Sequence, residues 1–150
     1  MITVYLAGPL FSEAERNWHM DTKRMLLEAA AKKDIAMTII WPYELITQEE
    51  IESLANEARD EIFRRCKEGL DKARIVVALL DGVQVDDGTA WEIGYFYGVR
   101  KTNHKIIGIR TDFRNAGESA GAIVNAMIEI SCDKIVHSRA ELLAEICELL

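Results

Sequence analysis

The chain lacks an excess of basic residues. Its 150 residues include 18 Lys and Arg against 25 Asp and Glu, which gives a net charge of −7 and an isoelectric point of about 5.0. Surfaces that bind nucleic acids or anionic membranes carry clustered positive charge. We therefore expect neither nucleic acid nor a membrane among its partners, whereas a neutral small molecule is compatible with this charge.

Long apolar runs and a basic leader are also missing. No stretch approaches the ~18 consecutive apolar residues of a membrane span. Residues 1–8 have the β-rich pattern of a strand and not the basic start of a signal peptide. The sequence alone thus gives no sign of membrane insertion or export.

Metal ligands and disulfide partners are sparse. The cysteines Cys66, Cys132 and Cys147 are odd in number and widely spaced, which fits neither a disulfide framework nor a zinc site. The histidines are equally scattered and lack ligand spacing; they are His19, His104 and His137. We predict no bound metal and a reducing, cytoplasmic location.

No internal repeat, low-complexity segment or linker divides the chain. A length of 150 residues suits one domain. Apolar residues make up 49% of the chain, enough for a substantial core at this size. The prediction is a single domain over residues 1–150.

Short β-rich runs alternate with longer helical patterns. The runs lie at 3–7, 37–41, 75–80, 105–109 and 134–136, and the helical patterns at 13–32, 48–71, 89–100, about 118–129 and 138–149. Continuous apolar runs suit strands buried on both faces of a parallel sheet. Regular alternation predicts a doubly wound α/β fold, flavodoxin- or Rossmann-like. We predict five parallel strands in the order 2-1-3-4-5, with helices on both faces.

Two loops of this fold are predicted to form a binding site. In open α/β sheets, ligands bind beyond the carboxyl ends of the strands, where the strand order reverses. Here the relevant loops are 8–11 and 81–89. The second loop and its helix bring together acids that include Asp81, Asp86 and Glu92, and the loop has no lysine for phosphate binding. This cluster suits hydroxyl recognition, proton transfer or nucleophilic attack.

A purely structural interpretation of the same residues is also open. Thr89 and Glu92 have the spacing of a capping box, in which Thr89 caps the helix and Glu92 binds back to the cap amide. Asp86 and Asp87 would then be favourable charges at a helix N-terminus. Spacing alone favours this interpretation.

Three segments together resemble the nucleoside 2-deoxyribosyltransferase family. They are YLAGPLF (5–11), DDGTAWEIG (86–94) and VNAMI (124–128). Each motif is modest alone, but their order and spacing fit the family over nearly the whole chain. The relatives include deoxynucleoside 5′-monophosphate glycosidases, so the resemblance implies cleavage of an N-glycosidic bond.

The resemblance implies three catalytic residues. Glu92 matches a glutamate that attacks the anomeric carbon, and Tyr5 matches a tyrosine that orients this carboxylate. Asp86 matches an aspartate that binds the deoxyribose hydroxyls. The implied reaction passes through a covalent deoxyribosyl-glutamate and requires no metal or organic cofactor.

The resemblance also implies substrate-binding residues. Gly8 and Phe11 match a loop that lines the pocket for base and sugar, and Gly88 belongs to the motif around Asp86. Asp81, at the start of the same loop, is a further candidate. Asn125 matches an asparagine donated by a neighbouring subunit to the sugar 5′-hydroxyl, which implies a homodimer or a higher homo-oligomer.

One position departs from the family pattern. Many relatives have an aspartate in the second long helix that passes a proton to the leaving base, where this chain has Cys66. A neutral thiol is a poor general acid. The nearby acids Asp60, Glu61 and Glu68 could replace it only under a different alignment, and a buried helix residue is the structural alternative for Cys66.

Three functions remain open at this point. The first is transfer of deoxyribose from 2′-deoxynucleosides to another nucleobase, and the second is hydrolysis of deoxynucleosides or their monophosphates. The third, motivated by Cys66, is a non-catalytic module that binds nucleosides or nucleotides. Asn125 suits a neutral 5′-hydroxyl, whereas Arg110, Arg114 and Ser119 are close enough in sequence to keep a phosphate open.

Overall fold

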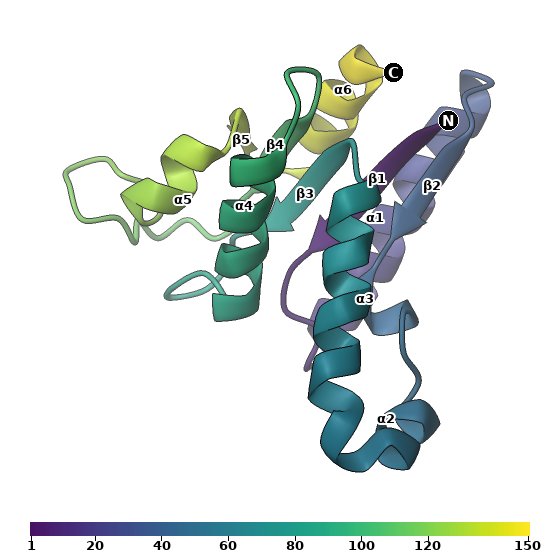
Figure 1. Ribbon diagram of the computed structural model, residues 1–150. Helices are drawn as coiled ribbons and strands as arrows, with labels where there is room; N and C mark the ends of the chain where they lie inside the picture. Colours follow the sequence, from purple (N-terminus) through teal and green to yellow (C-terminus); the bar gives the residue numbers. More distant parts are fainter.

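The five β-rich runs form one parallel sheet in the computed structural model, which describes residues 1–150 (Figure 1). The strands are β1 (Ile2–Ala7), β2 (Met37–Ile40), β3 (Ile75–Leu79), β4 (Lys105–Ile109) and β5 (Lys134–Val136). Their order is β2-β1-β3-β4-β5, so the predicted fold class and strand order are confirmed. None of the helices combines the length and the apolar character needed to cross a membrane.

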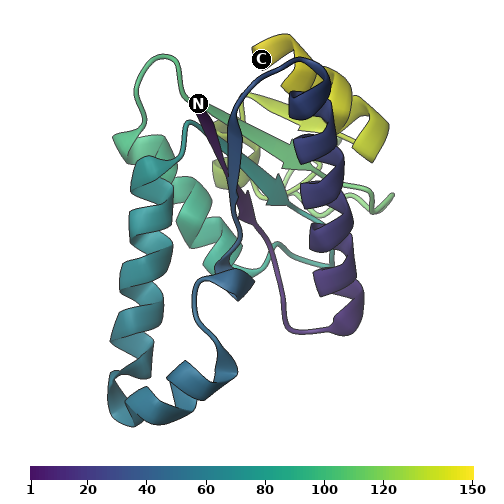
Figure 2. The same ribbon diagram turned by 90° about the vertical axis from the view of Figure 1, so that its right-hand side faces the viewer.

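Helices connect the strands and cover both faces of the sheet (Figures 1 and 2). They are α1 (Glu13–Lys32), α2 (Gln48–Leu54), α3 (Ala58–Lys72), α4 (Asp87–Val99), α5 (Ala126–Ser131) and α6 (Arg139–Leu149), with the short 3-10 turns η1 (Pro42–Glu44) and η2 (Ala55–Glu57). Helices α1 and α6 pack together on one face, and α3, α4 and α5 lie on the other.

The alternation of side chains along β1 explains the two layers of core. Val4 and Leu6 pack in the layer of α1 and α6, whereas Tyr5 and Ala7 pack in the layer of α3 and α4. Successive residues of a strand point to opposite faces, so a fully apolar pattern serves both layers. Tyr5 is completely buried and brings a hydroxyl into its layer. A buried hydroxyl of this kind needs a hydrogen-bond partner.

Two predicted helices have different boundaries in the structure. The helix predicted over 48–71 is broken at Ala55, whose φ of 46° lies in the left-handed region that interrupts a right-handed helix. The helix predicted over 118–129 begins only at Ala126, because the backbone of Asn125 is not helical, with a ψ of 136°, and its side chain caps the helix.

The break at Ala55 creates an arm, residues 42–57, that projects beyond the sheet (Figure 2). The arm comprises η1, α2 and η2, and its helix α2 packs against α3. It therefore extends the space beside α3 past the ends of the strands.

Candidate active site

A cleft of about 1010 Å³ lies beyond the carboxyl ends of β1 and β3, where the strand order reverses. This volume is at the upper end of the ~300–1,000 Å³ that is usual for small-molecule sites. Its walls come from the loop after β1, the first turns of α4, one face of α3 and the arm. The lining residues are Gly8, Leu10, Phe11, Pro42, Tyr43, Ile46, Thr47, Gln48, Glu49, Ile51, Arg59, Ile62, Phe63, Cys66, Asp86, Gly88, Thr89, Trp91 and Glu92.

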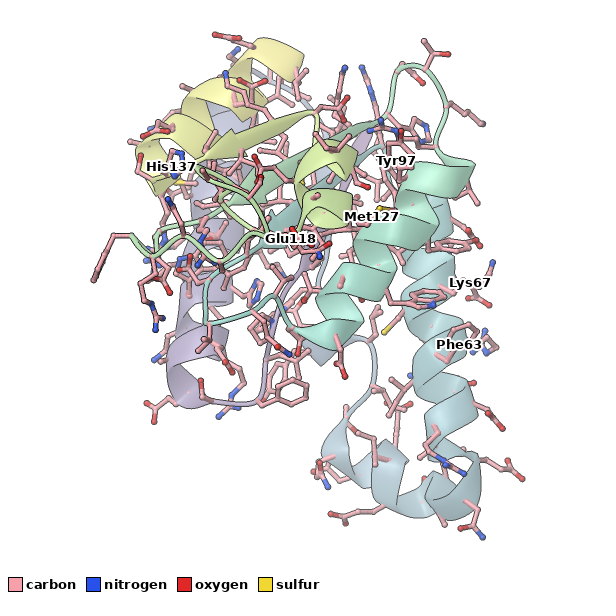
Figure 3. All side chains as sticks on the ribbon, turned by 90° about the vertical axis from the view of Figure 1, so that its left-hand side faces the viewer. Phe63, Lys67, Tyr97, Glu118, Met127 and His137 are labelled. Atoms are coloured by element: carbon pink, nitrogen blue, oxygen red, sulfur yellow. The ribbon has the colours of Figure 1, made fainter.

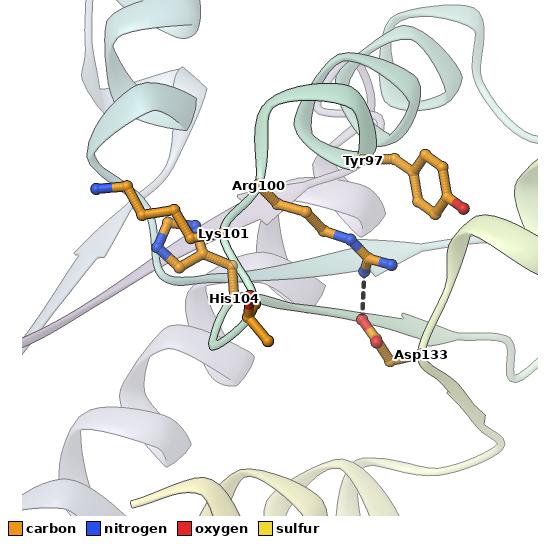
Figure 4. Close-up of a pocket in the computed structure, with 6 residues that line it drawn as sticks. Tyr97, Arg100, Lys101, His104 and Asp133 are labelled. Atoms are coloured by element: carbon orange, nitrogen blue, oxygen red, sulfur yellow. Dashed lines mark hydrogen bonds and ion pairs between the residues drawn. The ribbon is translucent and has the colours of Figure 1, made fainter.

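A smaller depression of about 360 Å³ lies at the opposite end of the sheet, before β4 (Figure 4). Its Arg100 pairs with Asp133 over 2.6 Å, and the same carboxylate accepts from the Ile106 amide over 2.8 Å. Both charges thus hold the loops around β4 and β5 together. The cleft at the carboxyl ends is therefore the candidate active site.

Glu92 and Tyr5 make a hydrogen bond between α4 and β1, at the base of the cleft. The Tyr5 hydroxyl donates to Glu92 Oε1 over 2.5 Å. The Tyr5 ring packs against Gly69 of α3, where an added Cβ would lie 3.0 Å from Tyr5 Cε2. Gly69 therefore makes room for the tyrosine that orients Glu92. The local sequence pattern does not reveal this role, because only the tertiary contact requires a small residue.

Burial shapes the chemistry of this pair. It raises the pKa of the Glu92 carboxyl from 4.5 to about 7, with the Tyr5 hydrogen bond lowering that pKa and the charge of Asp86 raising it. Burial and the charge of Glu92 raise the pKa of Tyr5 above its usual range, so its hydroxyl stays protonated and donates. A carboxylate in a cleft with a pKa near neutrality is typical of a catalytic group.

Asp86, and not Thr89, is the N-cap of α4. Asp86 Oδ2 accepts from the Thr89 amide over 2.9 Å and from the Thr89 hydroxyl over 3.0 Å. The prediction of a capping box between Thr89 and Glu92 is thus wrong, because the helix begins at Asp87, two residues before Thr89. The earlier start frees the Glu92 side chain to face Tyr5. It also sets the Asp86 carboxylate at the rim of the cleft.

Cys66 lines the cleft together with Glu92. Burial, followed by the charge of Glu92, raises the pKa of its thiol, which therefore stays neutral. The neighbouring acids of α3 do not line the cleft, and Glu61 and Glu68 pair instead with Arg64. The side of the cleft formed by α3 thus holds no carboxylic acid near Glu92 that could protonate a leaving group.

For the reaction that the family resemblance implies, Cys66→Asp is expected to raise turnover of substrates with poor leaving bases about tenfold or more, because general acid catalysis contributes ~10²–10⁴-fold. A second carboxyl next to Glu92 would share a proton with it at neutral pH. Cys66→Asn is the matched control, since it has a similar shape and no acidic proton. Equal rates for the two variants would show that another group protonates the base.

Gly8, Phe11 and Gly88 line the cleft together with Asp86 and Glu92, whereas Asp81 does not. Asp81 is instead engaged by the loop after β4. Its carboxylate accepts hydrogen bonds from the backbone of the loop after β4, from the Thr111 amide over 2.6 Å and the Asp112 amide over 2.9 Å.

Asn125 also lies outside the cleft of its own chain. It is the N-cap of α5, with its Oδ1 accepting from the Met127 amide over 3.0 Å and its Nδ2 donating to Glu118. Its position after the long loop thus ties it to α5 and not to Glu92.

The arginines considered for phosphate binding serve the loops. Arg110 is fully buried and donates to the carbonyls of Leu80 and Gly82, and Arg114 pairs with Asp112. Neither arginine lines the cleft, and neither does Ser119. The structure therefore offers no phosphate site from these residues.

The sequence motifs do not identify most of the cleft residues on α3 and on the arm. Arg59, Ile62 and Phe63 share one face of α3 with Cys66, at the i, i+3, i+4 and i+7 spacing of a helix stripe. Phe63 is 54% exposed, which marks this stripe as something other than core. The helical spacing from Cys66 is the signal that could have located them.

The fold and the cleft agree with comparisons against known proteins. A family profile described as nucleoside 2-deoxyribosyltransferase matches residues 4–127, and the chain belongs to this family. Among curated protein sequences, none matches it.

Several solved structures share the fold. A 2-deoxyribosyltransferase from Bacillus psychrosaccharolyticus has a TM-score of 0.72 and 23% identity, covering 94% of this chain and 90% of its own. A 2-deoxyribosyltransferase from Leishmania mexicana has a TM-score of 0.68 and 20% identity, covering 99% and 98%. A conserved protein from Enterococcus faecalis V583 has a TM-score of 0.67 and 23% identity, covering 100% and 99%. At these identities the likeness concerns the fold.

Proposed function

We propose that this protein is a nucleoside 2-deoxyribosyltransferase that moves deoxyribose from a 2′-deoxynucleoside to another nucleobase. The observation that carries the proposal is the Tyr5–Glu92 hydrogen bond at the cleft. It orients a carboxylate whose pKa lies close to neutrality. This is the arrangement that nucleophilic attack on a sugar carbon needs.

In the proposed reaction, the Glu92 carboxylate attacks C1′ of the deoxyribose. The bond from C1′ to the base nitrogen breaks, and its electron pair leaves with the base, which takes a proton from solvent. A nitrogen of the second base then attacks C1′ from the face that the first base left, the electron pair of the C1′–oxygen bond returns to Glu92, and the proton of that nitrogen passes to solvent. Two inversions give net retention. Asp86 binds the sugar hydroxyls through Oδ1, because Oδ2 caps the helix.

Hydrolysis of the same deoxynucleosides is the second candidate. It is favoured by the open rim of the cleft, where Phe11 is 76% exposed. Water that enters there would compete with a nucleobase for the covalent intermediate. The chemistry at Glu92 is identical for both acceptors.

One assay separates the candidates. The protein is incubated with deoxyinosine, with and without free adenine. Formation of deoxyadenosine in the reaction with adenine supports the transferase. Release of hypoxanthine at the same rate with and without adenine supports the hydrolase. Binding of deoxyinosine without any turnover would contradict both and leave a non-catalytic binding module.

We also propose that two copies associate through the outer faces of α3, α4 and α5. Tyr97 and Met127 lie on this side of the molecule, as does Phe63, which also lines the cleft (Figure 3), and all three are exposed. Gly94 and Gly98 of α4 have open space where a Cβ would be, which lets a second helix approach closely. Exposed apolar surface of this kind is typical of an interface.

In such a homodimer, Asn125 would complete the partner's cleft at the sugar 5′-hydroxyl. Its place on α5 beside α4 supports this arrangement, because α5 adjoins the proposed interface. A two-fold contact buries the same patch on both copies, so each subunit would donate one asparagine and receive one.

Mixing inactive Glu92→Ala subunits with weakened Asn125→Ala subunits is expected to restore activity. Each heterodimer regains one site with both residues, so a one-to-one mixture reaches about a quarter of the wild-type sites. The control mixes Asn125→Ala with the double variant Glu92→Ala/Asn125→Ala, which cannot form an intact site. A fully active monomer by light scattering at assay concentration would contradict the shared site.

A further inference from the structure

We propose that the cleft accepts a leaving base with a long apolar substituent that ends in an anion, and that Arg59 binds this anion. The inference rests on the proposed function, because it takes Glu92 as the sugar end of the cleft. It concerns the opposite end, which the proposed reaction on an unsubstituted deoxynucleoside does not use.

The cleft is longer than a nucleoside base requires. Arg59 and Cys66 lie on the same face of α3, and a rise of 1.5 Å per residue separates them by about 10 Å along the helix. Cys66 and Glu92 line the same cleft, and the charge of Glu92 raises the pKa of the Cys66 thiol. A base bound next to the sugar therefore lies beside Cys66. Two further helical turns of cleft then remain between the base and Arg59.

The direction of this extra space fits a purine substituted on its exocyclic N6. The sugar is attached at N9, and N6 lies on the far side of the purine ring system. A substituent on N6 therefore points away from Glu92 and along α3. An unsubstituted purine would leave that length of cleft to solvent.

The wall opposite α3 is held in place by Arg65. Its guanidinium donates to the carbonyl of Leu45 over 2.6 Å and pairs with Glu50 over 3.1 Å, which ties the arm to α3. Ile46 and Ile51 of the arm face the cleft. Between the arm and α3 the cleft is thus a bounded, largely apolar channel, suited to an alkyl or aryl group.

Arg59 is the first residue of α3 that lines the cleft, and it is the only positively charged residue among those that do; its side chain is exposed. It forms no ion pair, whereas Arg64 and Arg65 of the same helix are both paired. A guanidinium without a partner in a cleft is suited to bind a carboxylate through two parallel hydrogen bonds.

Among the acids that line the cleft, Glu49 is the nearest to Arg59 in sequence, and it could pair with Arg59 in place of a bound anion. Glu49 lies in the first turn of α2, and hydrogen bonding there lowers the pKa of its carboxyl. Its charge therefore serves the N-terminus of α2, where negative charge is favourable. Arg59 remains free for a ligand.

Three substrates test the inference: 2′-deoxyadenosine, its N6-benzyl derivative and its N6-(4-carboxybenzyl) derivative. The wild-type protein is expected to show a kcat/KM about tenfold or more higher for the carboxybenzyl than for the benzyl compound, the size of one charge-assisted hydrogen bond. This ratio should fall to about 1 in Arg59→Met. It should stay at the wild-type value in the control Lys72→Met, which removes the same charge from an exposed position at the far end of α3.

Calorimetric binding of the free bases N6-benzyladenine and N6-(4-carboxybenzyl)adenine gives the same comparison without any bond cleavage. A ratio near 1 in the wild-type protein, or a ratio that Arg59→Met leaves unchanged, would overturn the inference. Turnover of 2′-deoxyadenosine alongside such a result would leave the proposed function intact. No turnover of any of the three nucleosides would contradict the proposed function, and the ratio of the binding constants would then decide whether Arg59 recognises the anion.

Discussion

Replacing Glu92 with alanine is expected to lower turnover of 2′-deoxynucleosides by about four orders of magnitude. In the proposed mechanism the variant has no nucleophile for C1′, and the only acid that shares its end of the cleft, Asp86, is engaged as the cap of α4. The fold should survive, because the cap remains in place. The loss of the Tyr5 hydrogen bond should cost about 1–3 kcal/mol, since the buried hydroxyl loses its partner.

The measurement compares kcat/KM and the thermal midpoint of wild type, Glu92→Ala and Asp87→Ala. Asp87 is an exposed acid of the same helix that does not line the cleft, so its variant is the matched control. It should keep most of its activity. A folded Glu92→Ala protein with more than a tenth of wild-type activity would show that the nucleophile lies elsewhere.

The second large effect is on pH dependence. Burial raises the pKa of Glu92 to about 7, and in the proposed mechanism only the ionised carboxylate attacks, so kcat/KM should fall about tenfold per pH unit below neutrality, or about 100-fold at pH 5. Tyr5→Phe removes a hydrogen bond that lowers this pKa, and its acidic limb should move to higher pH. A profile that is flat between pH 5 and 7 would contradict the assignment of Glu92.

The same pKa fixes the sign of a stability effect. A carboxyl whose pKa is raised on folding, here from 4.5 to about 7, costs no stability at pH 4, an increasing amount as the pH rises from about 4.5 to 7, and a constant amount at higher pH. Glu92→Gln removes this cost, which is on the order of 3 kcal/mol. Urea unfolding should therefore find Glu92→Gln similar to wild type at pH 4 and more stable at pH 8. Greater stability of wild type at pH 8 would mean that the Glu92 carboxylate is well solvated.

The sheet could be predicted because its signals are local. Five apolar runs with helical patterns between them allow few topologies, and the observed order is the predicted one. The helix boundaries were harder to predict from the sequence. The turn at Ala55 uses a residue that is usually a strong helix former, and at the start of α4 both Asp86 and Thr89 are good caps.

The site was predictable only in part for a related reason. Asp81 and Asp86 are both acids of one loop, and their sequence positions do not tell which one faces the cleft. The difference lies in their partners: Asp81 is engaged by the backbone after β4, and Asp86 by Thr89 in the first turn of α4. Such choices depend on contacts between distant segments. The pairing of Tyr5 with Glu92 came from family resemblance for the same reason.

Trapping of the glycosyl-enzyme tests most directly whether Glu92 becomes covalently bound to deoxyribose. A 2′-fluoro-2′-deoxynucleoside should form the glycosyl-enzyme slowly and retain it, because fluorine at C2′ destabilises the oxocarbenium-like transition state. Mass spectrometry of the digested protein should then find one fluorodeoxyribosyl group on Glu92, and none on the Glu92→Ala protein. A label on Asp86, or cleavage of the nucleoside without any covalent adduct, would contradict the account.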